Sequence, residues 1–541
     1  MLVSLLLLFI LMSVDENMYE YDDEVRDLNY SRVLDVHVWS DYPEVNVFVD
    51  YIYDEYFLVE GGNKRIKKKH LKVVLLDLYV AWLTDPDLNV GVHMTRDFYS
   101  KNFGTNTKRY NELNISAKTI DIVHTLTDVG LIGYKVGQEA QEGFDKGFIS
   151  RIWSTSKLIE LFKQSALDEF MIYSHHDRAV IVMRDEDKKD IPFEDNEERL
   201  SMASVVRRYN DLLERTFIDV GEANSPSLTI KKKSGSKNKN KPHIVHITHN
   251  GKFTRRIFNN SDWIQSGRFY GGFWQRISAD LRKKLLINDE QTVEVDFSAL
   301  HPVLAYSKAG LDYWKEHKVG PYDISVRGVK DPGISRDIVK KLLLLALNAS
   351  DKTVLFKAFR REFEYSSLGE LTFKFTDKVL DEILTDIKEK HHMIANQIAT
   401  GAGLKLMNLD SSIVEFVIKR FLEANTPVLS IHDSFIVQWS QRDRLVKAME
   451  DAFSFVTGQS QIKYKQNVPT YQDAVAWRHL DRDFYLDRVF ALQDTKRTRG
   501  YLNRLNKHNK FFNPKSEGSN SVQYMPDEVL APKRYKKYQG L

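Results

Sequence analysis

The chain of 541 residues contains no cysteine. It therefore has no disulfide bonds, no thiolate metal site and no cysteine nucleophile, and a reducing cell interior is compatible with it. The apolar run Met1–Met12 is shorter than the roughly 20 residues that span a bilayer, and it lacks the basic region and small-residue cleavage site of a secretory signal. We expect no stable membrane association and a cytoplasmic location. Two interpretations of this run stay open: translation starts at Met12 or Met18, or the run is a short arm that docks on the body.

The sequence also lacks a large net charge, because 78 basic and 75 acidic side chains leave only +3. This balance conceals strong segregation along the chain. Residues 15–27 are mostly acidic, residues 231–241 are mostly lysine, and residues 496–541 contain 11 Lys or Arg against 3 Asp or Glu. Basic blocks of this kind suit the phosphate backbone of nucleic acids, although each could equally be a solvated linker or tail. No fixed-period repeat is visible, and the length allows about two to four domains.

One aspartate is predicted to stand at the end of a strand. Apolar and polar residues alternate from Thr292 to Phe297, which predicts a strand with one buried face and with Asp296 near its end. Pro302 is tolerated in the first turn of a following helix, and Gly310 can end that helix. The predicted unit is therefore strand, carboxylate, helix.

A second aspartate is predicted at the tip of a hairpin. The segment Val428–Val437 consists of two apolar runs around a polar His-Asp-Ser sequence, which predicts a β-hairpin with Asp433 at its turn. Two strand-borne carboxylates brought together on one sheet are what two-metal phosphoryl transfer requires. Either aspartate alone could instead cap a helix or a turn.

The region between residues 71 and 165 has the element order of a small DNA-binding domain. The predicted elements are a core helix at 71–83, a helix capped by Ser116 and ended by Gly130, strands at 131–136 and 148–153 around a Gly-containing loop, and a helix from Ser154. This order resembles a winged helix-turn-helix domain, in which the helix after Ser116 enters the major groove. Lys118 and Arg151 would then contact DNA. The alternative is any small α+β module.

Two further segments carry positive charge near the aspartates. Ser266–Ile277 interleaves arginines with aromatic residues and glycines, which suits stacking on bases and close approach to a phosphate backbone. A Gly-rich turn with core aromatics is the alternative. A long helix predicted from Ser335 carries Arg336 and Lys340 on one face, where they could bind a triphosphate, although basic pairs on helices are usually just solvated.

Taken in order, these segments resemble the motifs of family A DNA polymerases and phage-type single-subunit RNA polymerases. The motifs are Ser266-Gly267-Arg268 with Gln275, Asp296-Phe297-Ser298, Arg336-x-x-x-Lys340 and His432-Asp433-Ser434. With the N-terminal DNA-binding region added, they look like the transposon-virophage polymerase family, a divergent branch of that superfamily. The resemblance covers about residues 250–480, and four motifs in the right order are much harder to obtain by accident than one.

The resemblance implies a DNA-directed DNA polymerase of a mobile element, phage or virus. Its substrates would be nucleoside triphosphates and a DNA primer-template, with replication proteins as further partners. Asp296 and Asp433 would coordinate two Mg²⁺ ions, and Arg336 and Lys340 would bind the incoming triphosphate. The remaining implied roles are Arg268 and Gln275 for holding primer or template, and His432 beside the primer terminus.

Three residues depart from the family pattern. Ser434 follows the second aspartate, as in phage-type RNA polymerases, where family A DNA polymerases carry Glu. Asn348 stands where the relatives have the stacking Tyr, and His301 occupies the site of the Glu that excludes a ribose 2′-hydroxyl; both would line the nucleotide site. The alternatives are therefore a primase or single-subunit RNA polymerase, and a catalytically silent DNA-binding initiator or regulator. The N-terminal half has no strand-borne Asp-x-Glu pair that would predict a proofreading exonuclease.

The predicted fold class is α+β, with a right-hand polymerase palm built on an antiparallel sheet, helical fingers, and an N-terminal winged helix-turn-helix domain. The predicted divisions are an extension at 1–60, the winged-helix domain at 61–170, a connector and Lys-rich linker at 171–242, the palm and fingers at 243–485, and a basic, flexible tail at 486–541.

Overall fold

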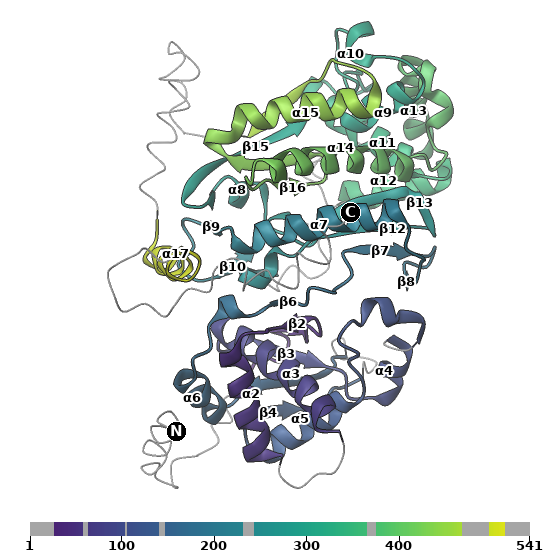
Figure 1. Cartoon of the computed structure of the whole chain (residues 1–541). Coiled ribbons are helices and arrows are strands. Elements are labelled where there is room, and N and C mark those ends of the chain that lie inside the picture. Colours follow the sequence, from purple (N-terminus) through teal and green to yellow (C-terminus); the bar gives the residue numbers. More distant parts are fainter. Residues whose placement is uncertain are drawn as a thin grey trace.

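The computed structural model describes residues 26–57, 63–102, 105–139, 147–230, 243–364, 375–467 and 497–513. The protein mixes helices with several sheets and has two large hydrophobic cores, which Figure 1 shows one below the other. The first core is built from residues between Leu34 and Ile172, and the second from residues between Val180 and Phe453. The apolar run Met1–Met12 and the Lys-rich linker 231–242 lie outside the described residues. Among the described residues, no helix is both long and apolar enough to cross a membrane.

The N-terminal unit contains most of the elements predicted for it. Its elements are β1 (Ser31–Val33), β2 (Val38–Trp39), α2 (Pro43–Tyr56), α3 (Lys64–Thr84), β3 (Asn89–Val92), α4 (Arg96–Asn102), the 3-10 helix η2 (Thr105–Tyr110), α5 (Lys118–Asp128), β4 (Ile132–Lys135), β5 (Ser150–Ser154), α6 (Ser156–Gln164), the 3-10 helix η3 (Glu169–Met171) and β6 (Tyr173–Ser174).

The sheet of this unit has the order β1-β3-β5-β4, with β1 parallel to β3 and the other pairs antiparallel. Helix α5 buries Ile122, Val123 and Leu126, the stripe that its 3.6-residue period predicts, and the hairpin β4–β5 follows it directly. Helix α2 buries Val45, Phe48 and Ile52 in the same core. The unit is therefore larger than the predicted 61–170, because residues before 60 help to close it.

The second unit carries the remaining elements. They are β7 (Ile181–Arg184), β8 (Asp190–Ile191), α7 (Glu197–Arg215), β9 (Ile218–Val220), β10 (Ser227–Ile230), β11 (His243–His246), η4 (His249–Lys252), β12 (Arg255–Asn259), β13 (Asp262–Tyr270), η5 (Phe273–Gln275), α8 (Ala279–Arg282), β14 (Leu285–Ile287), β15 (Glu290–Phe297), α9 (Leu300–Lys308), α10 (Tyr313–Glu316), α11 (Pro332–Asn348), α12 (Lys352–Glu364), α13 (Asp377–Lys390), η7 (His392–Gln397), α14 (Gly403–Glu423), β16 (Leu429–Ile431), β17 (Ser434–Gln438), η8 (Trp439–Gln441), α15 (Arg442–Thr457), β18 (Tyr464–Asn467) and α17 (Arg499–Phe512).

Two sheets organise this unit. One has the order β16-β17-β15-β14-β9, with β18 also pairing with β15, and its pairs are antiparallel. The other has the order β13-β12-β7-β8, and helix α14 packs against its edge strand β13 as well as against α15 and α9. The predicted connector is thus partly core, because β7 pairs with β12 and α7 buries Val206, Tyr209 and Leu213.

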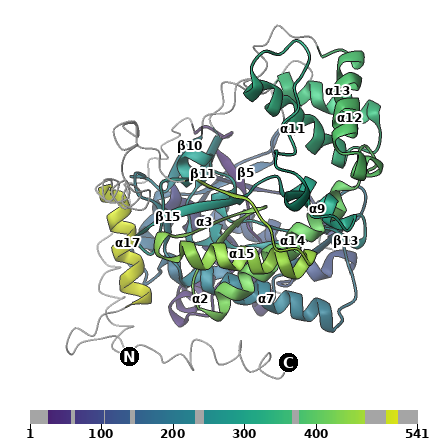
Figure 2. The same cartoon turned by 90° about the horizontal axis from the view of Figure 1, so that it is seen from above.

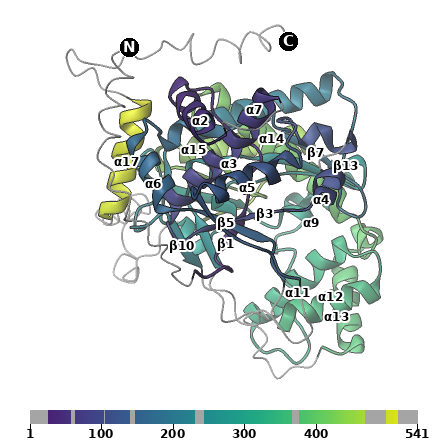
Figure 3. The ribbon, with the colours of Figure 1, turned by 90° about the horizontal axis from the view of Figure 1, so that it is seen from below.

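Helices α11, α12 and α13 gather on one side of the second unit, apart from its sheets, as Figures 2 and 3 show from opposite directions. Helix α11 begins at Pro332 with Asp331 as its N-cap, a few residues before the predicted cap Ser335. A proline in the first turn costs no hydrogen bond, which explains the earlier start. Helix α11 packs against both α12 and α13.

The C-terminal segment contains a helix where the sequence predicted a flexible tail. Helix α17 lies on the side opposite α11–α13 (Figures 2 and 3). Its Tyr501 and Leu505 pack with Phe217 of the loop before β9 and Leu286 of β14, and Arg504 forms an ion pair with the buried Asp219 at 2.7 Å. Phe511 and Phe512 also contact Phe170 of the N-terminal unit. The prediction failed here because a basic composition does not reveal an apolar helix face.

Candidate active site

The structure brings the two predicted carboxylates to neighbouring strands. Asp296 lies near the end of β15, directly opposite Ser434 of the antiparallel strand β17. Asp433 precedes Ser434 in the turn of the β16–β17 hairpin, and its carbonyl accepts the N–H of Phe297 at 3.4 Å. The pairing of β15 with β17 therefore brings the hairpin turn that carries Asp433 beside the end of β15 that carries Asp296.

The backbone beside each aspartate is in an uncommon conformation. His432 in the hairpin turn has φ +55°, and Ala299, between β15 and α9, has φ +58°. Both values lie in the left-handed region, which non-glycine residues rarely occupy. Strain of this kind persists where the surrounding structure enforces it, and it concentrates at functional sites.

The electrostatics of the site confirm that the carboxylates are close. Burial, the charge of Asp433 and the charge of Glu294 raise the pKa of Asp296 to about 7, against opposing effects from Lys340 and Lys465. Desolvation and a like charge both disfavour an ionised carboxyl, so the pair is poorly neutralised by the protein alone. A divalent cation would neutralise the negative charge of the two carboxylates.

A third carboxylate, Glu294, lies two residues before Asp296 on the same strand face but is already occupied. It accepts hydrogen bonds from Arg282 at 3.0 and 3.1 Å, and from the Ser434 hydroxyl at 3.0 Å. Because both of its oxygens already accept hydrogen bonds, we do not assign Glu294 as a primary metal ligand. The sequence contained one indication of Glu294, because it lies two residues before Asp296 in the predicted strand and so on the same face.

The predicted basic pair stands on α11. Lys340 is exposed, and its charge acts on Asp296. Arg336 Nε lies 3.4 Å from Asp323 Oδ1, and its guanidinium carbon lies 5.4 Å from the centroid of the Tyr322 ring. Burial, and then the charges of Asp433 and Asp296, raise the pKa of the Tyr322 hydroxyl. The face of α11 that carries both cations is therefore directed towards the carboxylates.

Asn348 does not face the nucleotide position as freely as predicted. Its side-chain amide donates to the carbonyl of Leu344 at 2.7 Å, one turn earlier on α11. Its side chain also abuts Gly403 at the start of α14, where a larger residue would collide with it. The Asn348 side chain is therefore bonded to its own helix and packed against the start of α14, and its place at the nucleotide site stays a prediction.

Lys465 is a residue of the site that the sequence reasoning missed. Strand β18 pairs with β15 so that Lys465 lies opposite Asp296, on the side away from β17. Lys465 is exposed, and its charge acts on Asp296. The only signal in the sequence was the alternation of Lys463, Tyr464 and Lys465, which is too short to assign a strand.

Arg268 and His301 are found in one cluster rather than in two separate roles. Arg268 Nε lies 3.1 and 3.0 Å from the carboxylate oxygens of Asp410, and its Nη2 also donates to that carboxylate. His301 Nε2 lies 2.8 Å from Asp410 Oδ2 and 2.8 Å from Arg268 Nη2. Asp410, on α14, is fully buried and was not singled out in the sequence. A buried carboxylate therefore holds both side chains, and the predicted roles of Arg268 at the primer or template and of His301 at the sugar stay predictions.

His432 and Gln275 are also placed by the structure. The His432 ring contacts Tyr270 at 5.8 Å between centroids, and burial followed by the charge of Arg268 lowers the pKa of His432, which keeps its imidazole neutral near pH 7. Gln275 donates its amide to the carbonyls of Phe269 and Ser430, both at 3.0 Å. Gln275 therefore joins β13 to β16, and its contact with nucleic acid stays a prediction.

The two predicted DNA contacts of the N-terminal unit differ in exposure. Lys118 is exposed at the start of α5. Arg151 is only 8% exposed, and its guanidinium donates to the carbonyls of Leu28 and Ile149. The DNA contact predicted for Arg151 is therefore corrected to a structural role, because β5 is covered by the segment before β1.

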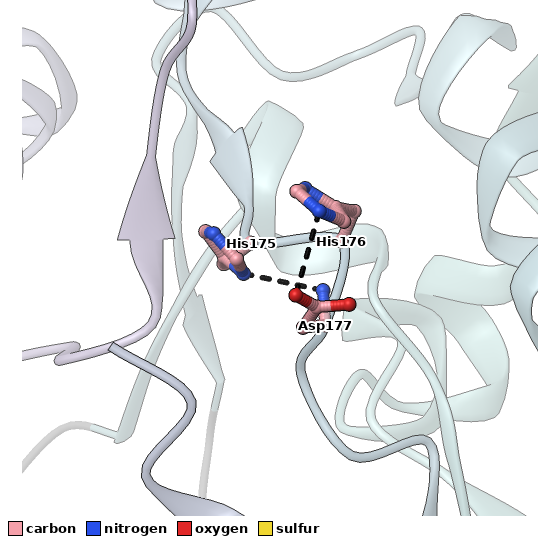
Figure 4. Close-up of side chains that lie close together, drawn as sticks. All are labelled: His175, His176 and Asp177. Atoms are coloured by element: carbon pink, nitrogen blue, oxygen red, sulfur yellow. Dashed lines mark hydrogen bonds and ion pairs between the residues drawn. The ribbon is translucent and has the colours of Figure 1, made fainter. Parts of the chain in front are cut away.

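A second group of titratable side chains lies between the two units. His175, His176 and Asp177 follow β6, and their possible ligand atoms lie within 4.8 Å of one another (Figure 4). The two imidazole rings stack at 4.3 Å with 25° between their planes, and the N–H of Asp177 donates to His175 Nδ1 at 3.2 Å. His176 Nε2 also lies 3.5 Å from Asp177 Oδ2. The carboxylate pair suits Mg²⁺ better, because hard cations prefer oxygen ligands to imidazole nitrogens.

Comparison with known proteins adds little. No model of a protein family matches the chain, and no curated protein matches it. Among solved structures, the POL domain of Pol1 from M. smegmatis, determined in complex with DNA primer-template and dNTP, is similar over 51% of this chain and 52% of that chain. The TM-score is 0.24 and 11% of the aligned residues are identical, and the match spans about half the length of that domain. A similarity this low carries no functional argument, so the site geometry must carry it.

Proposed function

We propose that this protein is a template-directed nucleic-acid polymerase, a nucleotidyltransferase that extends a DNA primer. The observation that carries the proposal is that Asp296, on β15, and Asp433, in the turn that leads into the neighbouring strand β17, lie at the same end of an antiparallel pair. Burial and the negative charge of its neighbours raise the pKa of Asp296 to about 7. Two such carboxylates hold the metal ions of in-line phosphoryl transfer.

Asp296 and Asp433 are suited to Mg²⁺. Both offer hard carboxylate oxygens, and their charges repel each other in a partly desolvated setting, so a small divalent cation is favoured. Two bound ions would lower the pKa of the attacking hydroxyl and neutralise the phosphates of the triphosphate.

The surrounding side chains have roles that follow from their charge. Lys340 and Arg336 on α11 would bind the triphosphate and stabilise the leaving pyrophosphate, since they lie one turn apart on the same helix and the charge of Lys340 acts on Asp296. His432, with a neutral imidazole beside Tyr270, can accept or donate one hydrogen bond at the primer end. Catalysis by these residues would consist of positioning and charge stabilisation.

We further propose that the chain belongs with the transposon-virophage polymerases and that its N-terminal unit is a winged-helix module for DNA. The order of the four motifs supports the first proposal. The order helix α3, strand β3, helices α4 and α5, and hairpin β4–β5 supports the second. Such an enzyme would copy DNA for a mobile element, phage or virus, with replication proteins as partners.

Primer extension tests the polymerase function directly. Asp296→Asn and Asp433→Asn should each lower nucleotide addition under Mg²⁺ by roughly 10³-fold or more, and the double variant should be little worse, because residues that act as a unit are not additive. Glu290→Gln is the matched control, since Glu290 lies on the same strand but bonds only to Gln438 and Ser440. Full extension by either asparagine variant would refute the assignment.

A further inference from the structure

The cluster of Arg268, His301 and Asp410 contains a buried charge that packing of the core does not require. Asp410 lies on the buried face of α14 among Leu406, Ile413 and Val414, and it is fully buried. Removing a carboxylate from water is costly, and hydrophobic residues of similar volume often replace a buried ion pair without loss of stability. Stability alone therefore does not explain a charge at this position.

The cluster joins three elements beside the carboxylate pair. Arg268 lies on β13, two residues before Tyr270, whose ring contacts His432. His301 lies on α9, five residues after Asp296. Residues two apart on a strand share a face, so Arg268 and Tyr270 lie on the same face of β13, and the cluster borders the hairpin turn that carries His432 and Asp433. Asp410 is the only member that has no exposed surface.

The hydrogen bonds fix the orientation of both partners. Two nitrogens of Arg268 donate to Asp410, which sets the plane of the guanidinium, as bidentate pairs do. His301 Nε2 lies 2.8 Å from Asp410 Oδ2, which sets the orientation of the ring. Without Asp410, Arg268 would be a buried unpaired cation that must move, and His301 would lose its anchor.

We propose that Asp410 is a positioning residue, which acts through Arg268 and His301 to align the primer end and to shape the space for the sugar of the incoming nucleotide. The inference rests on the proposed polymerase function and deepens it. It assigns sugar selection to the cluster of three residues, in which His301 contributes only while Asp410 holds it.

A second ion pair between the same helix and the same sheet provides a matched control. Glu415 on α14 lies 2.6 Å from Arg256 on β12, and Arg256 also donates to Ser411 and to the carbonyl of Gly267. This pair is also largely buried, with 3% of the Arg256 side chain exposed. It includes neither His301 nor a residue that contacts His432. Its loss should cost stability of the same kind without reaching the site.

The test compares full-length Asp410→Asn with Glu415→Gln in primer extension, measuring kcat and KM for dNTPs and NTPs alongside thermal unfolding. We expect Asp410→Asn to lose about 10²-fold in kcat, the scale of a small misalignment of reacting groups. Its preference between dNTPs and NTPs should change by about tenfold, the effect of altering one pocket contact. Glu415→Gln should show a comparable loss of thermal stability with unchanged kcat and selectivity.

A double variant, Arg268→Met with Asp410→Leu, covers the case in which the single substitution unfolds the protein. It leaves no unpaired buried charge and should fold. We expect it to be as slow as Asp410→Asn. Restored activity in the double variant, or equal losses in Asp410→Asn and Glu415→Gln, would show that the cluster only stabilises the fold. A wild-type protein that extends no primer refutes the polymerase function itself and this inference with it.

Discussion

Asp296 has the most informative local environment in the chain. Its pKa of about 7 arises from burial, then from Asp433 and Glu294. An aspartate in the folded state then holds a proton that the unfolded chain releases near pH 4. Between about pH 4 and 7 the stability that depends on this group therefore falls as the pH rises, because the folded state binds more protons there.

Asp296→Asn should raise the stability of the metal-free protein at pH 8 by about 1–3 kcal/mol, since a pKa difference of one corresponds to about 1.4 kcal/mol. Mg²⁺ binds the ionised carboxylates, so its affinity for the wild type should fall by about fivefold between pH 7 and 6. Thermal unfolding at pH 6, 7 and 8, with and without Mg²⁺, measures both effects. A wild type whose Mg²⁺-induced stabilisation does not vary with pH would contradict the raised pKa.

His301→Gly tests sugar choice at a single side chain. We expect the wild type to prefer dNTPs, because the imidazole limits the room for a 2′-hydroxyl, and we expect the glycine variant to lose about ten- to two-hundredfold of that preference. Single-nucleotide extension with matched dNTP and NTP pairs gives the ratio. Equal use of NTPs by the wild type would favour the primase or RNA polymerase alternative, with which Ser434 agrees.

At the scale of elements, the site is assembled from one central strand and what flanks it. β17 brings Asp433 to one side of β15, and β18 brings Lys465 to the other. Lys340 comes from α11, one of the three helices that Figures 2 and 3 show to one side of the sheets. Lys340 and Lys465 therefore both act on the carboxylate of Asp296 from different elements. One of them can bind the triphosphate while the other binds the primer-template.

Lys340→Ala and Lys465→Ala separate those two elements. Lys340, on the helix that carries Arg336, should mainly affect the triphosphate, so we expect a fall in kcat/KM for dNTP of about 10²-fold or more. Lys465 lies on a sheet edge, and we expect weaker primer-template binding with a smaller salt dependence, because one phosphate contact is lost. Lys341→Ala is the control, since Lys341 pairs with Glu362. Unchanged DNA affinity in Lys465→Ala would show that this lysine only offsets the charge of Asp296.

At the scale of the whole molecule, two separately packed units are joined by the C-terminal helix. Lys507 of α17 forms an ion pair with Glu169 of the first unit at 3.0 Å, while Arg504 holds Asp219 of the second. Phe170 packs against His508, Phe511 and Phe512 of the same helix. We expect α17 to hold the proposed DNA-binding unit at a defined orientation to the proposed polymerase site.

The first unit should fold alone, because its core is separate from the second. We expect a fragment of residues 26–174 to bind duplex DNA with an affinity that falls as salt rises. Lys118→Ala should weaken it, whereas Arg151→Ala should destabilise the fold, since Arg151 is buried. Lys101→Ala, at a lysine paired with Asp97, is the control for DNA binding. The exposed face of α5 also carries Asp121 and Asp128, so a folded fragment without DNA affinity would identify a protein-docking module instead.

The sequence by itself determined the local units of this protein. Alternation at Thr292–Phe297 predicted β15, the polar tip at Asp433 predicted the β16–β17 hairpin, and the stripe of Ile122 and Leu126 predicted α5. These patterns were readable because a period of 2 or 3.6 residues is set by the backbone of the element itself. They also placed both catalytic candidates at the ends of elements.

Only the tertiary structure decided which side chains are free. Arg268 meets Asp410 across 142 positions, Lys465 meets Asp296 through an added strand, and Arg151 is covered by the segment before β1. Helix α17 is likewise a packed helix, because its apolar face contacts Phe217 and Leu286 of the second unit. Burial and ion pairing depend on partners that are distant in sequence. A local period of 2 or 3.6 residues therefore does not show that Arg268 will pair with the buried carboxylate of Asp410.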